Sequence, residues 1–481
     1  MEQKRYDRQA FADLAAACRV PLHEQLLHPA CPETPLDNGD SITLDLGNYY
    51  VGHLSFHLWH ADRYLDAPVR LRIKFCETAW ELEQDFSVSA AWICRSWLQE
   101  EVIHVDRPGQ FALPRRYACR YIRITVEATP QKLLLRDCCF RAVSSADTTA
   151  LRPLHTADAQ LRQLDSIAVN TLKNCMQGVF EDGPKRDRRL WSGDLRLQAL
   201  TNYYTFDNRE LVKKCLFLFA ACRTSAQGLV PSDVFEYVLD GDSNHVDYAL
   251  FYVVTVCEYF THTGDAETVE KLLPVCDNQL AGTAELIDGE GCPSCFVDWC
   301  EGLQKWLSLA GIYLYALEKY AAVLAHFDPP RAAVLNTELA TRRRTLQDTC
   351  FDPGKGLFLC DRDGRQISVH SQVWMILGGV AAGEQARRVL ETVSHTAGAL
   401  QPFTPYMHHY IAEAIAKTGD TAGALAYVRK IWGGMADADT FREVYVPGDP
   451  DFSAVWDRKL NSACHAWSST PAYFIRRYAQ P

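Results

Sequence analysis

The hydrophobic pattern of this 481-residue chain changes its period near residue 150, and this change constrains the fold more than any other feature. Before it, apolar and polar residues alternate: in VRLRIKFCE every second residue from Val69 to Phe75 is apolar, and the residues between are basic. LSFHL and YIRITVEA repeat the alternation, which is typical of half-buried antiparallel strands. Several such strands separated by turn residues predict a β-sandwich over residues 1–150, with a short lead segment at its N-terminal end.

After residue 150 the period becomes helical. About a dozen amphipathic segments follow, among them ADAQLRQLDSIAVNTLKNCM and TPYMHHYIAEAIAKTGD, and Gly, Asp or Pro signals end each of them. That number of helices, joined as hairpins over residues 151–481, is what an (α/α)6 toroid requires. A helical solenoid is the rival architecture, but its repeats should resemble one another, and these segments do not. We therefore expect a mainly α chain in which an antiparallel β-sandwich domain precedes an (α/α)6 toroid.

The charge and the cysteines exclude some classes of function. The chain carries 49 Lys and Arg against 60 Asp and Glu, a formal charge of −11, and has no basic block, so we expect no nucleic-acid partner. No apolar run approaches bilayer-spanning length, and the first residues lack the apolar region of a secretory signal, so no membrane partner is expected. The 18 Cys are scattered, as in reduced cytoplasmic proteins. The expected location is the cytoplasm, and the sequence is compatible with a homo-oligomer.

Four long loops between the helical segments are rich in carboxylates and aromatic residues. They are EDGPKRDRRLWSGD, PSDVFEYVLDGDSNHVDY, CPSCFVDWCEG and ADADTFREVYVPGDPDF. A closed double ring of helices leaves a funnel lined by such loops at one end, and we expect the function to reside there. Carboxylates beside flat apolar rings favour a pocket for a polyol ring. For the first loop alone, the alternative is a solvated segment before a helix.

In their order along the chain, these loops resemble those of the α-L-rhamnosidases of glycoside hydrolase family 78. The family signature is Asp-x-Pro-x-Arg, the acid residue, Arg and then Trp-x-Gly-Asp, and the chain matches it from Asp182 to Asp194. The segments HVDYALFYVVTVCEYFTHTGD, FVDW, TFREVY and NSACHAWSSTPAYFI resemble the later motifs, and the N-terminal strands resemble the family's β-sandwich. The chain departs from the family at four places: Asp187 replaces the usual Glu, RRLW lacks one residue and a Gly that many members carry before the Trp, His245 occupies a Trp position, and TFREVY lacks flanking Trp residues.

The resemblance implies an inverting glycosidase. Inversion needs one carboxylic acid that protonates the leaving oxygen and one carboxylate that activates water, about 6.5–9.5 Å apart. The matching positions are Asp187 for the general acid and Glu443 for the general base, and a closed ring of helices would bring them together. An ion pair with a flanking Arg would lower the pKa of Asp187 and work against this role. In that case Glu181 or Glu301 is the replacement acid.

The resemblance also implies a set of sugar-binding residues. Asp182 and Asp194 are expected to accept hydrogen bonds from vicinal hydroxyls, although Asp194 also suits the N-terminus of a helix. Trp191 and Trp299 would offer flat walls for the C6 methyl of rhamnose or for a sugar face, with core packing as the alternative. The remaining expected substrate contacts are Arg186, His245, Asp247, Asp298 and His465. For each His the alternative is a structural role.

We expect no metal and no cofactor. Cys292 and Cys295 form one C-x-x-C pair without a matching second pair, a poor zinc signal, and DGDSNHVD matches a calcium loop in composition but not in spacing. The sequence therefore predicts an inverting hydrolase that removes terminal α-L-rhamnosyl or closely related residues from small glycosides or oligosaccharides. Two alternatives stay open: the same fold and mechanism with a different sugar, and a carbohydrate-binding protein without catalysis.

Overall fold

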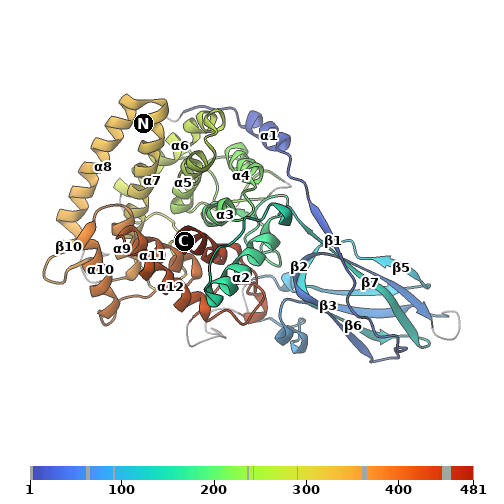
Figure 1. Ribbon diagram of the computed structural model, residues 1–481. Helices are drawn as coiled ribbons and strands as arrows, with labels where there is room; N and C mark the ends of the chain where they lie inside the picture. The colour runs from blue at the N-terminus through green and yellow to red at the C-terminus, as the bar shows by residue number, and fades with distance from the viewer. Residues whose placement is uncertain are drawn as a thin grey trace.

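A sheet and a ring of helices lie side by side in the computed structural model of the chain (Figure 1). The structure describes residues 4–60, 66–89, 93–235, 238–241, 243–289, 291–359, 366–446 and 457–479. The last strand of the sheet ends at Ser144, and the first helix of the ring begins at Ala159.

The N-terminal part is one antiparallel sheet in the order β1-β7-β2-β6-β3-β4, with β5 paired to β2. Its strands are β1 (His23–Leu27), β2 (Ser41–His60), β3 (Val69–Cys76), β4 (Glu100–Val105), β5 (Gly109–Ala112), β6 (Tyr117–Ala128) and β7 (Leu133–Ser144). Buried and exposed residues alternate along the strands: in β3, Leu71 and Ile73 are fully buried, whereas Arg70 is exposed. The inward faces of the strands form one apolar core, which confirms the predicted β-sandwich.

The long strand β2 takes part in two pairings. Residues 41–52 pair with β6, residues 52–60 pair with β7, and the register with β6 shifts between Asp45 and Tyr50. Gly47 lies in this irregular stretch with φ of +77°, a left-handed conformation that glycine adopts without steric cost. Such a bulge bends a strand and lets it follow the sheet around the core.

Twelve helices make up the ring in the described part of the chain. They are α2 (Ala159–Cys175), α3 (Ser192–Tyr204), α4 (Arg209–Ala221), α5 (Val246–Thr263), α6 (Ala266–Asp288), α7 (Trp306–Phe327), α8 (Pro329–Cys350), α9 (Val369–Leu377), α10 (Gly383–His395), α11 (Pro405–Lys417), α12 (Thr421–Gly433) and α13 (Pro471–Tyr478). Helices α3, α5, α7, α9 and α11 contact one another in turn, and α13 closes the inner ring against α3. The short helix η5 (Ala466–Ser469) lies between α11 and α13. This double ring confirms the predicted (α/α)6 toroid.

Short connections complete the chain. The two-stranded pieces are β8 (Leu190–Trp191) with β9 (Asp233–Val234), and β10 (Phe351–Asp352) with β11 (Leu357–Phe358). The remaining 3-10 helices are η1 (Ala79–Glu83), η2 (Arg95–Trp97), η3 (Thr148–Ala150) and η4 (Arg458–Leu460).

The ends of several helices follow from local sequence. Asp158, Asn208, Asp265 and Asp328 each accept, through the side chain, the N–H three residues further on, with N···O distances of 3.0 to 3.1 Å. These bonds satisfy N–H groups that a first turn leaves without a partner. Gly264 ends α5 with φ of +69°, the left-handed conformation common at this position.

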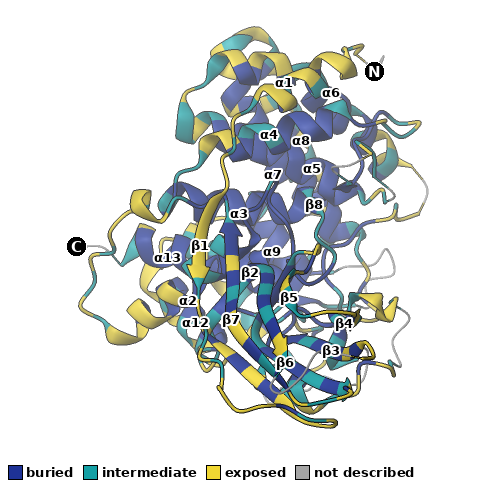
Figure 2. Ribbon diagram, turned by 90° about the vertical axis from the view of Figure 1, so that its right-hand side faces the viewer, coloured by how far each residue is buried: buried dark blue, intermediate teal, exposed yellow. Residues whose placement is uncertain are grey.

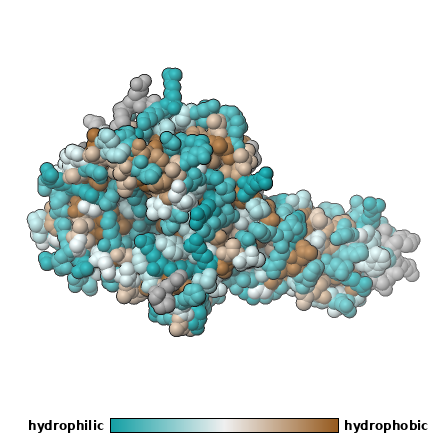
Figure 3. All heavy atoms as spheres, turned by 45° about the horizontal axis from the view of Figure 1, so that its top comes forward, coloured by the Kyte–Doolittle hydropathy of each residue, from teal (hydrophilic) through white to brown (hydrophobic). Residues whose placement is uncertain are grey.

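Inner and outer helices differ in burial, as Figure 2 shows. Most of α5 is buried, whereas the outer helix α8 buries only Ala332, Leu339 and Leu346. The inner helix α7 corrects the expectation that no apolar run approaches bilayer-spanning length. It has 22 residues, and its most apolar 18-residue window has a mean hydropathy of 1.2, which would suffice to cross a membrane. Its most apolar window is 83% buried among the other helices, so its composition matches its place in the core. The face drawn in Figure 3 is mainly hydrophilic, with hydrophobic residues in scattered groups.

The lead segment packs on the ring of helices rather than on the sheet that follows it in sequence. Helix α1 (Arg8–Ala17) lies against α4, and the ring of Phe11 is centred 5.9 Å from that of Phe217. Lys4 forms an ion pair with Asp277 on α6. Because Phe11 and Ala15 are buried in the core of the ring, this segment adds to the helical domain.

Candidate active site

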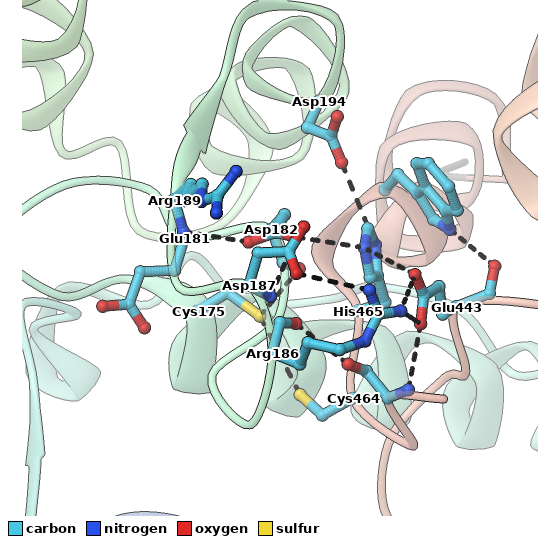
Figure 4. Close-up of polar contacts among 12 residues, drawn as sticks. Cys175, Glu181, Asp182, Arg186, Asp187, Arg189, Asp194, Glu443, Cys464 and His465 are labelled. Carbon is cyan, nitrogen blue, oxygen red and sulfur yellow. Dashed lines mark hydrogen bonds and ion pairs between the residues drawn. The ribbon is translucent and has the colours of Figure 1, made fainter. Parts of the chain in front are cut away.

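Two segments that are distant in sequence lie side by side at the candidate site (Figure 4). The first, residues 181–191, connects α2 to α3. The second comprises residues 441–446 and 461–465, which precede η5. Backbone hydrogen bonds hold the assembly, since Ala466 donates to the carbonyl of Asp182 (2.8 Å) and Glu443 donates to that of Ser462 (3.0 Å). The closed ring thus brings the two predicted catalytic loops together.

Gly183 of the first segment and Gly193 at the start of α3 each allow a close approach of another side chain. A Cβ atom on Gly183 would lie 2.8 Å from Oγ of Ser462, and one on Gly193 would lie 2.6 Å from Cζ of Tyr248. Neither position has room for a side chain, so the glycines of the motif are explained by packing.

Asp182 organises the first segment. Its Oδ1 accepts the N–H of Arg189 (3.1 Å), and its Oδ2 accepts the N–H of Asp187 (3.3 Å). Burial, together with the carboxylates of Asp187 and Asp194, raises the pKa of Asp182 well above its usual range. The residue expected to bind a hydroxyl therefore also fixes the backbone of Asp187.

Arg186 joins the two predicted catalytic carboxylates. Its Nη2 donates to both oxygens of Glu443 (2.5 and 2.6 Å), and its Nη1 lies 3.3 Å from Oδ1 of Asp187. Its Nε donates to the carbonyl of Leu460 (2.8 Å). Burial would lower the pKa of Arg186, but Glu443 and Asp187 outweigh it and raise that pKa, so the guanidinium is charged. Arg186 was expected to contact the substrate, whereas these bonds direct it to protein groups.

The environment of Asp187 raises its pKa despite the flanking arginines. Burial is the largest cause, Arg186 opposes it, and the negative charge of Glu443 adds to it. The side chain of Arg188 donates to the carbonyl of Pro184 (2.6 Å) and to Oε1 of Gln99 in the sheet domain (3.2 Å) rather than to Asp187. The side chain of Asp187 is 22% exposed, against 3% for Glu443. Asp187 is thus accessible, and its surroundings shift its pKa in the direction that an acid catalyst needs.

His465 lies among three carboxylates. Its Nε2 is 3.8 Å from Asp182 and 4.0 Å from Glu443, and its Nδ1 is 3.9 Å from Asp194 (Figure 4). Burial lowers the pKa of His465 well below its usual value, and Arg186 lowers it further, so the imidazole is neutral at neutral pH. Within the described residues, Nδ1 of His465 and Oδ1 of Asp194 are buried without a hydrogen-bond partner. Such atoms are unusual in a core and are suited to the hydroxyls of a ligand.

Asp194 occupies the first turn of α3, as its sequence position predicts. Burial raises its pKa well above the usual range, and a hydrogen bond from the hydroxyl of Tyr248 (3.4 Å) opposes the shift.

Aromatic rings border this cluster. A chain of ring contacts runs through Trp191, Tyr248, Phe296, Trp299 and Trp467, with centroid separations of 5.5 to 6.1 Å. The ring of Trp467 is centred 4.1 Å from the neighbouring imidazole. The two predicted walls, Trp191 and Trp299, are half-buried. The sequence reasoning did not name Tyr248, Phe296 or Trp467, although each stands one or two positions from a residue that it did name.

Asp247 and Asp298, two of the expected sugar contacts, bond to protein groups in the structure. Asp247 accepts the N–H groups of Phe296 (2.9 Å) and Val297 (2.7 Å), and Val297 has φ of +54°, which is costly for a β-branched residue. Asp298 accepts the imidazole of His370 (2.7 Å) and further bonds from residues 299, 403 and 404. Because their oxygens are taken by the protein, both residues anchor the loop that carries Phe296 and Trp299.

The remaining candidates lie at the margin of the cluster. His245 precedes the first turn of α5, half-buried, with its ring centred 5.7 Å from that of Tyr248. The carboxylate of Glu181 points away from the cluster and pairs with Arg116 of the sheet domain (Figure 4). Glu301 is exposed. The described residues contain no group of three or more His, Cys, Asp and Glu arranged to hold a metal ion, and Asp242 of the calcium-like motif lies outside them.

Two carboxyl groups around one guanidinium, bordered by aromatic rings on an (α/α)6 ring, are the arrangement expected of a glycoside hydrolase. The comparisons with known proteins identify the family of glycoside hydrolases. Residues 12–140 match the glycosyl hydrolase family 78 alpha-rhamnosidase N-terminal domain, and residues 151–306 match the bacterial alpha-L-rhamnosidase 6 hairpin glycosidase domain. The rhamnosidase from Klebsiella oxytoca, solved with rhamnose bound, is 35% identical with a TM-score of 0.92, and the match covers 98% of this chain and 99% of that one. The chain belongs to the α-L-rhamnosidases of glycoside hydrolase family 78.

More distant structures share the fold. The family 78 rhamnosidase of Bacillus sp. GL1 is 23% identical with a TM-score of 0.78, and the Streptomyces avermitilis α-L-rhamnosidase, complexed with L-rhamnose, is 16% identical with a TM-score of 0.71. The matches cover 93% and 95% of this chain but only 47% and 44% of those enzymes, so the chain spans about half their length. No curated protein sequence matches the chain.

Proposed function

We propose that the protein hydrolyses terminal α-L-rhamnosides of small glycosides or oligosaccharides with inversion, using Asp187 as general acid and Glu443 as general base. The observation that carries this proposal is the arrangement around Arg186. One charged guanidinium binds Glu443 through both oxygens and touches Asp187, whose pKa is nevertheless raised by burial. Glu443 is thus paired with a cation, while burial shifts Asp187 toward its acid form, and these environments suit the base and the acid that inversion requires.

The proposed reaction begins with the sugar in the cleft. Its hydroxyls would meet the unpartnered atoms of Asp194 and His465 and the carboxylate of Asp182. The rings of Trp191 and Trp299 would pack against its apolar face or its methyl group. Asp187 then donates a proton to the glycosidic oxygen, while Glu443 takes a proton from the water that attacks the anomeric carbon from the opposite side. The related enzyme from Klebsiella oxytoca, solved with rhamnose bound, supports L-rhamnose as the sugar.

The proposed location is the cytoplasm. The described cysteines are free thiols, including Cys175 and Cys464, whose Sγ atoms lie 3.9 Å apart and are not bonded. Free thiols in close pairs support a reducing compartment.

The test is hydrolysis of a panel of p-nitrophenyl glycosides, headed by the α-L-rhamnoside, by the wild-type protein and by Glu443→Gln. Nitrophenolate leaves with little acid assistance, so the loss measured is that of the base, and we expect a fall in kcat/KM of about a hundredfold or more. Glu301→Gln, on an exposed loop residue, should stay near the wild type. NMR of the first sugar product should show the inverted anomer.

Each other result has its own meaning. Cleavage of a different glycoside would retain the mechanism and change the sugar. Binding of sugars without cleavage of any glycoside would favour a carbohydrate-binding protein. A loss in Glu301→Gln equal to that in Glu443→Gln would contradict the assignment of the base.

A further inference from the structure

Glu77, the first residue after β3, reaches from the sheet domain into both segments of the candidate site. Its carboxylate is fully buried. Oε2 lies 2.8 Å from Nζ of Lys185 in the first segment and 2.8 Å from the N–H of Ala463 in the second. Its other oxygen accepts the hydroxyl of Tyr49 (2.7 Å). One oxygen of the sheet domain therefore binds the two segments of the helical domain at once.

Lys185 is buried and paired. It also lies 2.8 Å from Oε1 of Glu81 in η1, and its side chain is 2% exposed. Burial alone would lower the pKa of Lys185, but Glu77 and Glu81 outweigh it and raise that pKa, so the ammonium is charged. A buried ammonium between two carboxylates fixes its backbone, because moving it away would leave charges without partners.

The two contact points flank the proposed catalytic groups. Lys185 directly precedes Arg186, which holds Glu443 and touches Asp187. Ala463 directly follows Ser462, whose N–H donates to Oε2 of Glu443 (3.0 Å) and whose hydroxyl donates to the carbonyl of Arg186 (3.0 Å). A displacement at either point would move the guanidinium relative to the base.

Two further bonds from the sheet domain support the same segment. Arg116 of the sheet region pairs with Glu181, and Gln99 accepts a bond from Arg188 (3.2 Å). Gln99 is itself held by the backbone of Ala118, through bonds of 2.7 and 2.8 Å.

We infer that Glu77 is a positioning residue for catalysis: it sets the distance between the segment that carries Asp187 and Arg186 and the segment that orients Glu443. The sheet domain is then part of the catalytic apparatus without touching the substrate. This inference rests on the proposed function of the site.

Glu81 provides the comparison, because it contacts the same ammonium and the backbone N–H of Glu77 (2.6 Å) but not Ala463. Glu77→Met removes the link between the segments and leaves Lys185 paired with Glu81, whereas Glu81→Met leaves the link in place. We expect kcat for the rhamnoside to fall about a hundredfold in Glu77→Met and less than about fivefold in Glu81→Met. Glu77→Gln keeps an oxygen for Ala463 and should recover most of the lost rate. Rates are compared well below the unfolding midpoint of each variant.

Hydrogen–deuterium exchange provides a readout that does not depend on activity. The amides of residues 182–189 and 462–466 should exchange faster in Glu77→Met than in Glu81→Met. Equal rates and equal exchange in the two Met variants would overturn the inference, as would a failure of Glu77→Gln to recover the rate. A wild type that cleaves no rhamnoside would instead overturn the proposed function, and the exchange experiment would still decide on the positioning role.

Discussion

Two of the buried clusters of charged groups in the described part of the helical domain are built in opposite ways. The catalytic cluster consists of Asp182, Arg186, Asp187, Asp194, Glu443 and His465. The ring network consists of Arg196, Glu258, Tyr315, Lys319, His409 and Glu413, on α3, α5, α7 and α11. Helix α3 contributes to both, since Asp194 and Arg196 are two residues apart.

In the ring network the charges balance and both carboxylates are fully bonded. Arg196 donates to both oxygens of Glu258 (2.9 and 3.2 Å) and of Glu413 (2.9 and 3.0 Å). Tyr315 donates to Glu413 (2.6 Å), and Lys319 pairs with Glu258 (3.0 Å). Burial alone would raise the pKa of Glu258 and of Glu413, but Arg196 lowers both, with help from Lys319 at Glu258 and from His409 at Glu413, and the net pKa of each is lowered.

The catalytic cluster has four carboxyl groups and one guanidinium, which contacts Glu443 and Asp187. The acids exceed the bases, so burial raises the pKa of Asp182, Asp187 and Asp194, and Oδ1 of Asp194 is left without a partner. Burial is common to both clusters and does not distinguish them. The balance of charge does: a balanced cluster supports the fold, and an unbalanced one is arranged for a ligand and for proton transfer.

The largest effect is expected from Asp187→Asn. Removing a general acid lowers the rate by about 10² to 10⁴-fold when the leaving group needs protonation, and by much less for nitrophenolate. The measurement is kcat/KM for an alkyl and a nitrophenyl α-L-rhamnoside. Because the acid must be protonated, wild-type activity on the alkyl rhamnoside falls as the pH rises through the raised pKa of Asp187, and this basic limb should disappear in the variant. Equal losses on both substrates would contradict the role of acid.

The next largest effect is expected on the unfolding free energy, from a substitution in the ring network. Arg196→Met leaves Glu258 and Glu413 buried without their main partner, which typically costs about 3–5 kcal/mol of unfolding free energy. Urea unfolding measures the loss of unfolding free energy. At urea concentrations well below the unfolding transition, the rate of rhamnoside hydrolysis should stay within about threefold of the wild type. A collapse of activity with stability unchanged would show that the two clusters are not separate.

The sequence predicted the fold better than the division of roles in the site. The alternation around Ile73 and the helical period of α2 follow burial directly, so the sheet and the ring could be predicted from such patterns. The motif from Asp182 to Asp194 likewise indicated the site. The motif could not show that the oxygens of Asp298 accept hydrogen bonds from other protein groups, or that Glu77 contacts both segments of the site. Such contacts depend on the paths of loops and on the docking of two domains.

The stability of Glu413→Gln should depend on pH differently from that of the wild type, which tests the charge balance of the ring network. Arg196 lowers the pKa of Glu413 below the unfolded value of about 4.3, so its contribution is present above that pH and is lost as the pH falls through the folded pKa. The variant lacks this contribution and should be less stable by about 2 kcal/mol at neutral pH. Urea unfolding at pH values from about 7 down to about 3 should show the difference in unfolding free energy between wild type and variant as constant above about pH 4.3 and smaller below it. A difference that grows on acidification would contradict the charge assignment.

The smallest effect has the opposite sign. Burial raises the pKa of Asp194, so its contribution to stability is complete below the unfolded value of about 3.9 and is lost as the pH rises through the folded pKa. Asp194→Asn removes this titration and should raise the unfolding free energy at pH 7 by on the order of 1 kcal/mol, with no gain near pH 4. The same variant should lose rhamnoside hydrolysis, because an amide replaces the acceptor oxygens offered to the sugar. Lower stability of Asp194→Asn at pH 7 would mean that the bond from Tyr248 outweighs burial, and the catalytic cluster would then stabilise the fold as the ring network does.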